Sequence, residues 1–244
     1  MAKQLKGGYT TGACLAAGAK AGAMIMQGED TGDRVDIVAL DGTPLQIPIA
    51  SAELLAHGVK VEIIKDAGDD PDITNGTSVF ITFSFLTQEQ LQPVYGQSIL
   101  YKQILFEAGQ GIGHATKPGL SLAVGEPAIN PGPRQLVYNS IKDIIGDKAC
   151  LVRVDIPAGT ELATKTLNPV LGIEGGISVI GTTGVLRPMS EEAFKNSLVP
   201  QIEVAKAAGF TTQIFVPGKI GERIATSWGL PTEAMVQTSN FIGF

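Results

Sequence analysis

The chain has 244 residues, of which 44% are hydrophobic and 17% are charged. This length suits one large domain or two small ones, and the composition excludes a disordered chain. The formal net charge is −6 and lysine and arginine do not cluster, so a general nucleic-acid-binding protein is excluded. No apolar run approaches the roughly 20 residues of a membrane helix, and the first residues form no signal peptide. We therefore expect a cytoplasmic protein without a membrane partner.

The cysteines and histidines indicate no metal site. Cys14 and Cys150 lie in apolar stretches and are expected to be buried free thiols. His57 and His114 have no Cys or His companion at the spacing of a zinc or haem ligand set.

The first half of the sequence predicts a helix followed by strands. Residues 10–27 are rich in Ala and Gly and predict a buried helix that begins after a Thr-Thr-Gly turn and is capped by Gly28. Its small side chains allow close approach to a sheet or a ligand. Alternating apolar residues then predict strands over 34–40, 45–50, 58–65 and 78–85.

Loops dominate the next stretch of the sequence. Residues 98–109 fit a strand or a helix, and we favour the strand. A Gly-rich loop (109–119) and a Pro-rich loop (125–134) follow, and then a helix over 135–146 and a strand over 149–157.

The second half predicts a different architecture. Short apolar strands over 177–181, 211–218 and 234–240 alternate with helices over 190–209 and 218–229, which is the pattern of a parallel sheet. We expect an α/β fold with two domains, residues 1–165 and 166–244.

The loop KDAGDDPDITNG (65–76) carries four aspartates between two predicted strands: Asp66, Asp69, Asp70 and Asp72. Such crowding costs stability unless cations, N–H groups or a ligand offset it. The loop is not an EF-hand, because Ile81 stands where the twelfth-position Glu would be. A solvated turn, a looser cation site, an acceptor for ligand N–H groups and a base remain alternatives.

The carboxyl ends of the later strands predict a cofactor crevice. They read GTTG (181–184), PGK (217–219) and QTSN (237–240), all small and polar. No dinucleotide fingerprint follows the first strand. Lys117 and Arg134 lie in Pro-containing loops that could clamp a carboxylate, and they could equally be ordinary surface charges.

Several segments together resemble the CbiD family, the cobalt-precorrin-5B C1-methyltransferases of anaerobic cobalamin (vitamin B12) biosynthesis. They are GYTTGACLAAGAKAG (8–22), KDAGDDPDITNG (65–76), GIGHATKPGL (111–120), GEPAINPGPR (125–134), GISVIGTTGVLRPMSEEA (176–193) and TSNFIGF (238–244). Family members usually continue well beyond SNFIGF, with which this sequence ends.

The resemblance implies a first domain of the ribosomal-S5-domain-2-like type and a Rossmann-like second domain. It implies methyl transfer from S-adenosylmethionine to C1 of a cobalt-containing tetrapyrrole, giving cobalt-precorrin-6A, and it leaves a homo-oligomer open. The polycarboxylate substrate would explain placed cations such as Lys117, Arg134 and Arg187.

The resemblance also suggests roles for single residues. The catalytic candidates are Asp66, Asp69 and Asp70. The substrate-binding candidates are Thr10, Thr11, Asp72, Thr74, Gly111, Gly113, Lys117, Asn130 and Arg134. The cofactor-binding candidates are Gly181, Thr182, Thr183, Gly184, Pro217 and Gly218.

Two other function classes are kept as alternatives. A small-molecule kinase-like phosphotransferase would suit an S5-like domain with a Gly-rich loop, although no P-loop or kinase lysine motif is present. A non-catalytic tetrapyrrole carrier is the other.

Overall fold

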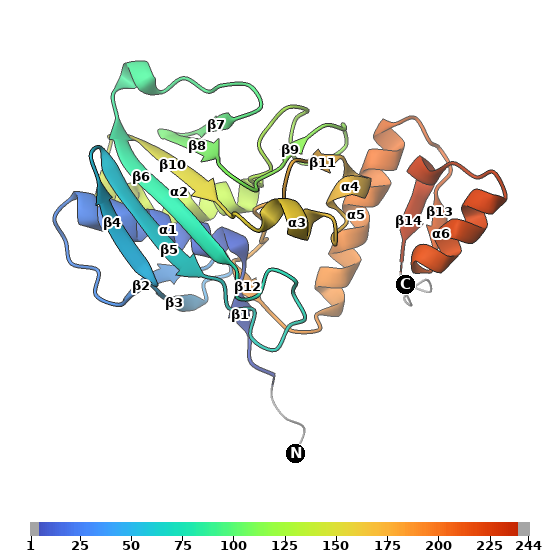
Figure 1. Cartoon of the computed structure of the whole chain (residues 1–244), viewed down its shortest axis with the longest axis horizontal. Helices are drawn as coiled ribbons and strands as arrows, with labels where there is room; N and C mark the ends of the chain where they lie inside the picture. Colours follow the sequence, from blue (N-terminus) through green and yellow to red (C-terminus); the bar gives the residue numbers. More distant parts are fainter. Residues whose placement is uncertain (1–4, 239–244) are drawn as a thin grey trace.

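The computed structural model describes residues 5–238 and is built around a six-stranded mixed sheet (Figure 1). Its order is β4-β5-β6-β10-β8-β7, and only β10 and β8 run parallel. The strands are β4 (Ser51–Leu55), β5 (Gly58–Ile64), β6 (Ser78–Leu86), β10 (Ala149–Asp155), β8 (Ile104–Ala108) and β7 (Ser98–Tyr101). A mixed α/β fold is therefore confirmed.

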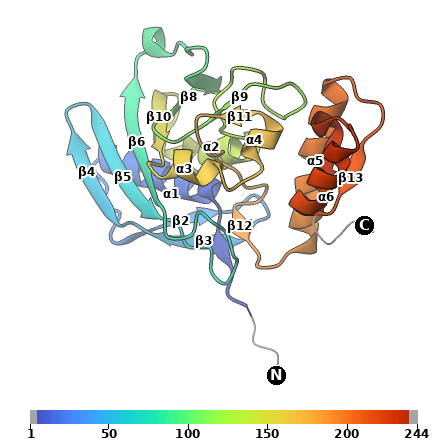
Figure 2. The same cartoon turned by 45° about the vertical axis from the view of Figure 1, so that its right-hand side comes forward.

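Two helices, α1 (Thr11–Met26) and α2 (Pro131–Ile145), pack side by side on one face of this sheet (Figures 1 and 2). The predicted helix over 10–27 is confirmed, with Thr10 as N-cap. Its glycines permit close packing, since a Cβ on Gly22 would lie 2.6 Å from the Cβ of Phe83. The largest hydrophobic core forms between these helices and the sheet.

The predicted strands of the first half are present, with two differences. Residues 98–109 form the hairpin β7–β8, which turns at Lys102 with a positive φ of 56°. Strand β4 was not predicted, and all of its residues are exposed. The hairpin of β2 (Arg34–Val38) and β3 (Pro44–Pro48) forms a separate small sheet.

Helix α2 begins at Pro131, four residues before the predicted start at 135. Asn130 is its N-cap, and Pro occupies the first helical position, where a missing N–H costs no hydrogen bond. Arg134 therefore lies in a helical turn and not in a loop.

The predicted strand over 177–181 is wrong. Ile177 and Val179 form only isolated bridges, with Ile112 and Ile129. The neighbouring short strands pair with the first part of the chain: β11 (Ile173–Glu174) with β9 (His114–Ala115), and β12 (Val185–Leu186) with β1 (Gly8–Tyr9). Two short helices, α3 (Gly159–Ala163) and α4 (Asn168–Leu171), connect β10 to β11.

The last part of the chain holds α5 (Glu191–Ala207), β13 (Ile214–Val216), α6 (Gly218–Ser227) and β14 (Met235–Gln237). Ser190 caps α5 as predicted, and β13 and β14 pair in parallel. The expected parallel sheet thus has two strands among the described residues, not three. Short 3₁₀ turns occur at Gln88–Gln90 and Thr232–Ala234. No helix within residues 5–238 is long and apolar enough to cross a membrane.

The boundary at residue 165 stays a prediction. Figures 1 and 2 show α5 between the central sheet and the β13–β14 pair.

Candidate functional site

The acidic loop joins β5 to β6 at one end of the central sheet, as predicted. Two backbone hydrogen bonds close it: Lys65 N donates to Thr77 O at 3.0 Å, and Gly76 N donates to Lys65 O at 2.8 Å. Each of the four carboxylates accepts hydrogen bonds from its own donors, which offsets the repulsion between them.

Asp72 neutralises a buried lysine. Lys65 is only 2% exposed, and its Nζ donates to Asp72 Oδ2 at 2.7 Å. The other oxygen, Oδ1, accepts from the backbone N and the hydroxyl of Thr74. Burial by itself would raise the pKa of Asp72, but the hydrogen bonds from Lys65 and Thr74 outweigh it and lower that pKa. Asp72 and Thr74 are thus occupied within the protein.

Asp66 and Asp69 hold the segment before β1. The carboxylate of Asp66 accepts from Lys6 Nζ at 2.8 Å and from Gly68 N at 2.8 Å, which lowers its pKa. Asp69 accepts from Lys6 N at 2.7 Å and is exposed.

Asp70 contacts a residue 119 positions later in the sequence. Its Oδ2 accepts from Met189 N at 3.2 Å, just before α5 begins. The acidic loop therefore connects the N-terminal strand with the approach to α5, which the sequence pattern could not predict.

A cavity of about 430 Å³ opens beside Asp66. Its walls come from Lys6 to Tyr9, from β3 and from Val185. Tyr9 is held by its hydroxyl, which donates to Ile64 O at 2.8 Å, and burial raises its pKa to about 12. Of the predicted site residues, Asp66 alone lines this cavity.

Thr10 and Thr11, predicted to contact the substrate, lie against the GTTG segment, predicted to contact the cofactor. Thr11 Oγ1 donates to Ile180 O at 3.3 Å and accepts from Ile180 N at 3.0 Å, and Thr10 N donates to Gly184 O at 2.9 Å. Thr10 Oγ1 accepts from Ala13 N as the cap of α1. Both threonines are buried, and the hydroxyl of Thr11 is the one that forms hydrogen bonds across this junction.

The N-terminus of α2 meets the same junction. A Cβ on Gly132 would lie 2.7 Å from Gly181 O, and Asn130 N donates to Val179 O at 3.1 Å. Thr182 is exposed, whereas Leu40 N donates to Thr183 O at 2.7 Å.

Pro217 and Gly218 lie elsewhere, at the junction of β13 and α6. In Figure 1, α5 lies between β12 and the elements β13 and α6. The expectation that they share one sheet edge with Gly181–Gly184 is wrong, because residues 177–181 do not join the β13–β14 sheet. The third expected edge, 237–240, continues into Ser239 and Asn240, which lie outside the described residues.

The predicted carboxylate clamps differ from each other. Arg134 is 7% exposed; its Nε donates to Ile129 O at 2.6 Å and its Nη2 to Glu126 Oε2 at 3.2 Å. Burial lowers its pKa against the opposing effect of Glu126. The expectation of a loop cation is therefore wrong for Arg134. Lys117 is half-buried and donates to Val170 O at 3.4 Å.

The glycines of the Gly-rich loop face protein. Gly111 has a φ of 74° and packs against Ile156 O, and a Cβ on Gly113 would lie 2.6 Å from Ile173. Their small size is thus explained by internal packing. Arg187, the other placed cation, is exposed and pairs with Asp41 at 3.1 Å.

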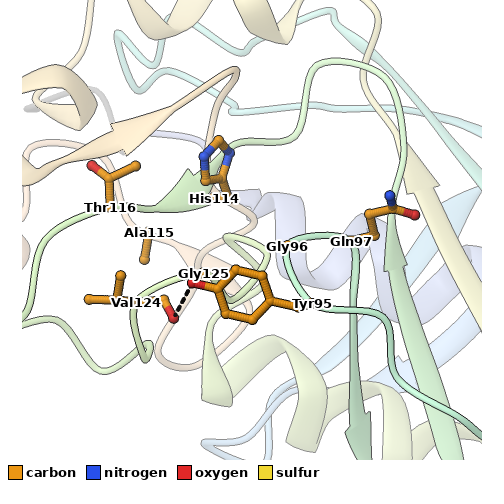
Figure 3. A pocket seen from close by; sticks show the side chains of 8 residues that line it. All are labelled: Tyr95, Gly96, Gln97, His114, Ala115, Thr116, Val124 and Gly125. Atoms are coloured by element: carbon orange, nitrogen blue, oxygen red, sulfur yellow. Dashed lines mark hydrogen bonds between the residues drawn. The ribbon is translucent and has the colours of Figure 1, made fainter.

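A second cavity of about 430 Å³ is lined in part by the Gly-rich loop and was not predicted from the sequence (Figure 3). It is lined by Tyr95, Gly96, Gln97, His114, Ala115, Thr116, Val124 and Gly125. Tyr95 is 80% exposed. Tyr95, an aromatic residue in an otherwise polar stretch, was the sequence feature that could have indicated this cavity.

Both cysteines are buried and free, as predicted, and burial raises the pKa of each thiol to about 12. Within residues 5–238, no group of three or more His, Cys, Asp or Glu side chains is arranged to hold a metal ion.

Comparison with known proteins gives consistent matches. The CbiD family model matches residues 1–188. A cobalt-precorrin-5B C(1)-methyltransferase of Desulfitobacterium hafniense is 42% identical over 240 residues, covering 98% of this chain and 59% of that protein. The proteins of the same name from Moorella thermoacetica (42%) and Methanocaldococcus jannaschii (43%) cover 100% and 99% of this chain, and 63% and 64% of their own lengths.

A solved structure shares the fold. It is a crystal structure titled as the cobalamin biosynthesis protein cbiD from Archaeoglobus fulgidus, with a TM-score of 0.55 and 21% identity. The alignment covers 95% of this chain and 70% of that one.

The chain spans about 60% of the length of the curated relatives it matches. The family model covers most of the chain, and the relatives exceed 40% identity over nearly all of it. This chain therefore belongs to the CbiD family.

Proposed function

We propose that this chain carries the S-adenosylmethionine-dependent methylation of C1 of cobalt-precorrin-5B to cobalt-precorrin-6A. One observation carries the proposal: at 42–43% identity, almost every residue of the chain aligns with proteins named for that methyl transfer. The cobalt would arrive as part of the substrate.

The proposed architecture has two units divided near residue 165. An S5-domain-2-like first unit is supported by the sheet with α1 and α2 on one face. A Rossmann-like second unit is supported by β13, α6 and β14, since two parallel strands joined by a helix are its repeating element.

Methyl transfer needs alignment more than strongly reactive side chains. The ring carbon forms a bond to the methyl group as the sulfur–methyl bond breaks, so both reactants must be held at near-attack distance. A carboxylate can take the proton that the ring then releases.

The acidic loop offers candidates for that base. Asp69 is exposed and Asp70 is half-buried, so both can meet a ligand, whereas Asp72 is paired with buried Lys65. Asp66 remains a candidate because it lines a cavity. Five other candidates would affect substrate binding only indirectly, by fixing the conformation of the surrounding backbone. They are Thr10, Thr11, Gly111, Gly113 and Arg134.

Turnover of the single-residue variants tests this proposal. Asp69→Ala and Asp70→Ala are compared with wild type for methyl transfer from S-adenosylmethionine to cobalt-precorrin-5B, followed as a one-methyl mass gain. Loss of a general base should lower kcat roughly 100-fold in at least one variant. Asp147→Ala, an exposed aspartate beyond the end of α2, is the matched control.

Wild-type turnover with both loop variants unchanged would remove Asp69 and Asp70 from the chemistry and leave Asp66 as the loop's one candidate base. Binding of the macrocycle without methyl transfer by wild type would favour a carrier. Phosphate transfer from ATP would favour the kinase-like alternative.

A further inference from the structure

The cavity drawn in Figure 3 has the features of a binding site for an uncharged nucleoside. Its volume of about 430 Å³ falls in the range of small-ligand pockets. It lies outside the acidic loop and the GTTG segment discussed above.

Tyr95 supplies an aromatic platform. Gly125, with a φ of 86°, lies directly against the ring, and a side chain there would overlap the ring atoms. The Tyr95 hydroxyl donates to Val124 O at 3.5 Å, and the residue is 80% exposed. A flat ligand can therefore stack on the free face of the ring while the backbone supports the other face.

Unused polar groups surround this platform. In Figure 3, His114 lies across the cavity from the Tyr95 ring, with Thr116 and Gln97 on either side. Among the described residues, neither the His114 imidazole nor the Gln97 amide has a hydrogen-bond partner. These two groups can donate to and accept from the edge of a heterocyclic base.

Glu174 adds a carboxylate beside two of the lining residues, His114 and Thr116. It stands opposite His114 in the β9–β11 pair, and its Oε1 is 3.2 Å from the Thr116 hydroxyl, which lines the cavity. A carboxylate accepts well from a ribose diol, and the same charge would repel a carboxylate arm of the tetrapyrrole.

The charge of the lining argues against a phosphorylated ligand. The eight described residues that line the cavity include no lysine and no arginine, the side chains that most often bind phosphate groups. We propose that this cavity binds a phosphate-free purine nucleoside, with its base on Tyr95 and its diol at Glu174. The proposal rests on the proposed function in one respect: it assigns the cavity to the adenosyl end of the methyl donor.

Calorimetric titration of the whole chain with 5′-methylthioadenosine tests the site directly. We expect binding that Tyr95→Ala weakens roughly tenfold, because stacking of a base is lost. Tyr95→Phe should keep the affinity within about twofold, since it keeps the ring. Trp228→Ala, which removes an exposed aromatic from the last part of the chain, is the control and should leave the affinity unchanged.

Ribose recognition is tested with Glu174→Gln. Wild type should bind adenosine more tightly than 2′,3′-dideoxyadenosine, and the variant should lose most of that preference. ATP should bind no more tightly than 5′-methylthioadenosine.

The inference is overturned if wild type binds no nucleoside, if Tyr95→Ala and Glu174→Gln bind as wild type does, or if ATP binds far more tightly. It is also overturned if a carboxylate-bearing cobalt corrin, cobyrinic acid, displaces the nucleoside by a competition that depends on Tyr95. Methyl transfer with an unchanged Tyr95→Ala variant would overturn the inference alone. Tyr95-dependent nucleoside binding without methyl transfer would overturn the proposed function alone.

Discussion

Lys65 and Asp72 form the buried ion pair on which the acidic loop depends. Lys65 is 2% exposed, and Asp72 Oδ2 lies 2.7 Å from its Nζ. Asp72→Ala would leave a buried ammonium group unpaired, so we expect the free energy of unfolding to fall by about 3–5 kcal/mol. Urea denaturation at pH 7 measures this loss, with the exposed Asp69→Ala as a matched aspartate control expected to lose less than about 1 kcal/mol.

The pair of Lys65 and Asp72 also determines whether the free energy of unfolding rises or falls with pH. The pKa of Asp72 is lower in the folded chain than the value of about 3.9 in an unfolded one. Its contribution is therefore complete well above the unfolded pKa, from about pH 5, and is lost as the pH falls through the lower, folded pKa. The difference between wild type and Asp72→Ala should shrink in acid. A difference that is absent at pH 7, or that stays constant down to pH 2, would contradict the role of the pair.

Sequence patterns predicted the elements whose signals are local. The Thr-Thr-Gly turn and the Ala/Gly composition indicated α1, and alternation indicated β5 and β6 on either side of the acidic loop. Strand β4 was missed because both of its faces are exposed, so no alternation marks it. The start of α2 could have been predicted, since Pro131 after Asn130 is a typical first helical residue.

Close packing of α1 on the sheet leads to a prediction at the scale of elements. A Cβ on Gly18 would overlap the side chain of Ile81. In an exposed helix, Gly→Ala would stabilise by roughly 0.5–1 kcal/mol, but overpacking typically costs about 1–3 kcal/mol. We expect Gly18→Ala to be destabilising overall in urea denaturation.

A compensating change checks the cause. Ile81→Val removes the terminal methyl group that the new Cβ of Gly18→Ala would meet, so the double variant should be more stable than the sum of the two single losses predicts. Strict additivity would show that helix and sheet do not meet at this point.

At the scale of the whole molecule, the sequence could not show which segments meet. Residues 177–181 are apolar and β-branched, as in a buried strand, but they pack beside Ile112 and Ile129 and not beside β13. This pairing joins residues far apart in the sequence, which no periodicity reports. The same reason explains why Thr10 and Gly184 lie together although they were predicted for different ligands, and why the Tyr95 cavity was not predicted.

The size of the hydrophobic cores predicts how the molecule opens. Helices α1 and α2 cover the large core of the central sheet, whereas β13, α6 and β14 share a small one made of Val216, Ala225 and Met235 with Ile214. Fewer buried apolar contacts mean a smaller free energy of local opening. In hydrogen exchange followed by mass spectrometry, we expect the amides of residues 214–216 and 235–237 to exchange well before those of β5, β6 and β10.

The β5, β6 and β10 peptides serve as the internal reference in the same sample. Equal protection of both groups would show that α5 couples the two parts into one cooperative unit, and the small core would then not limit stability.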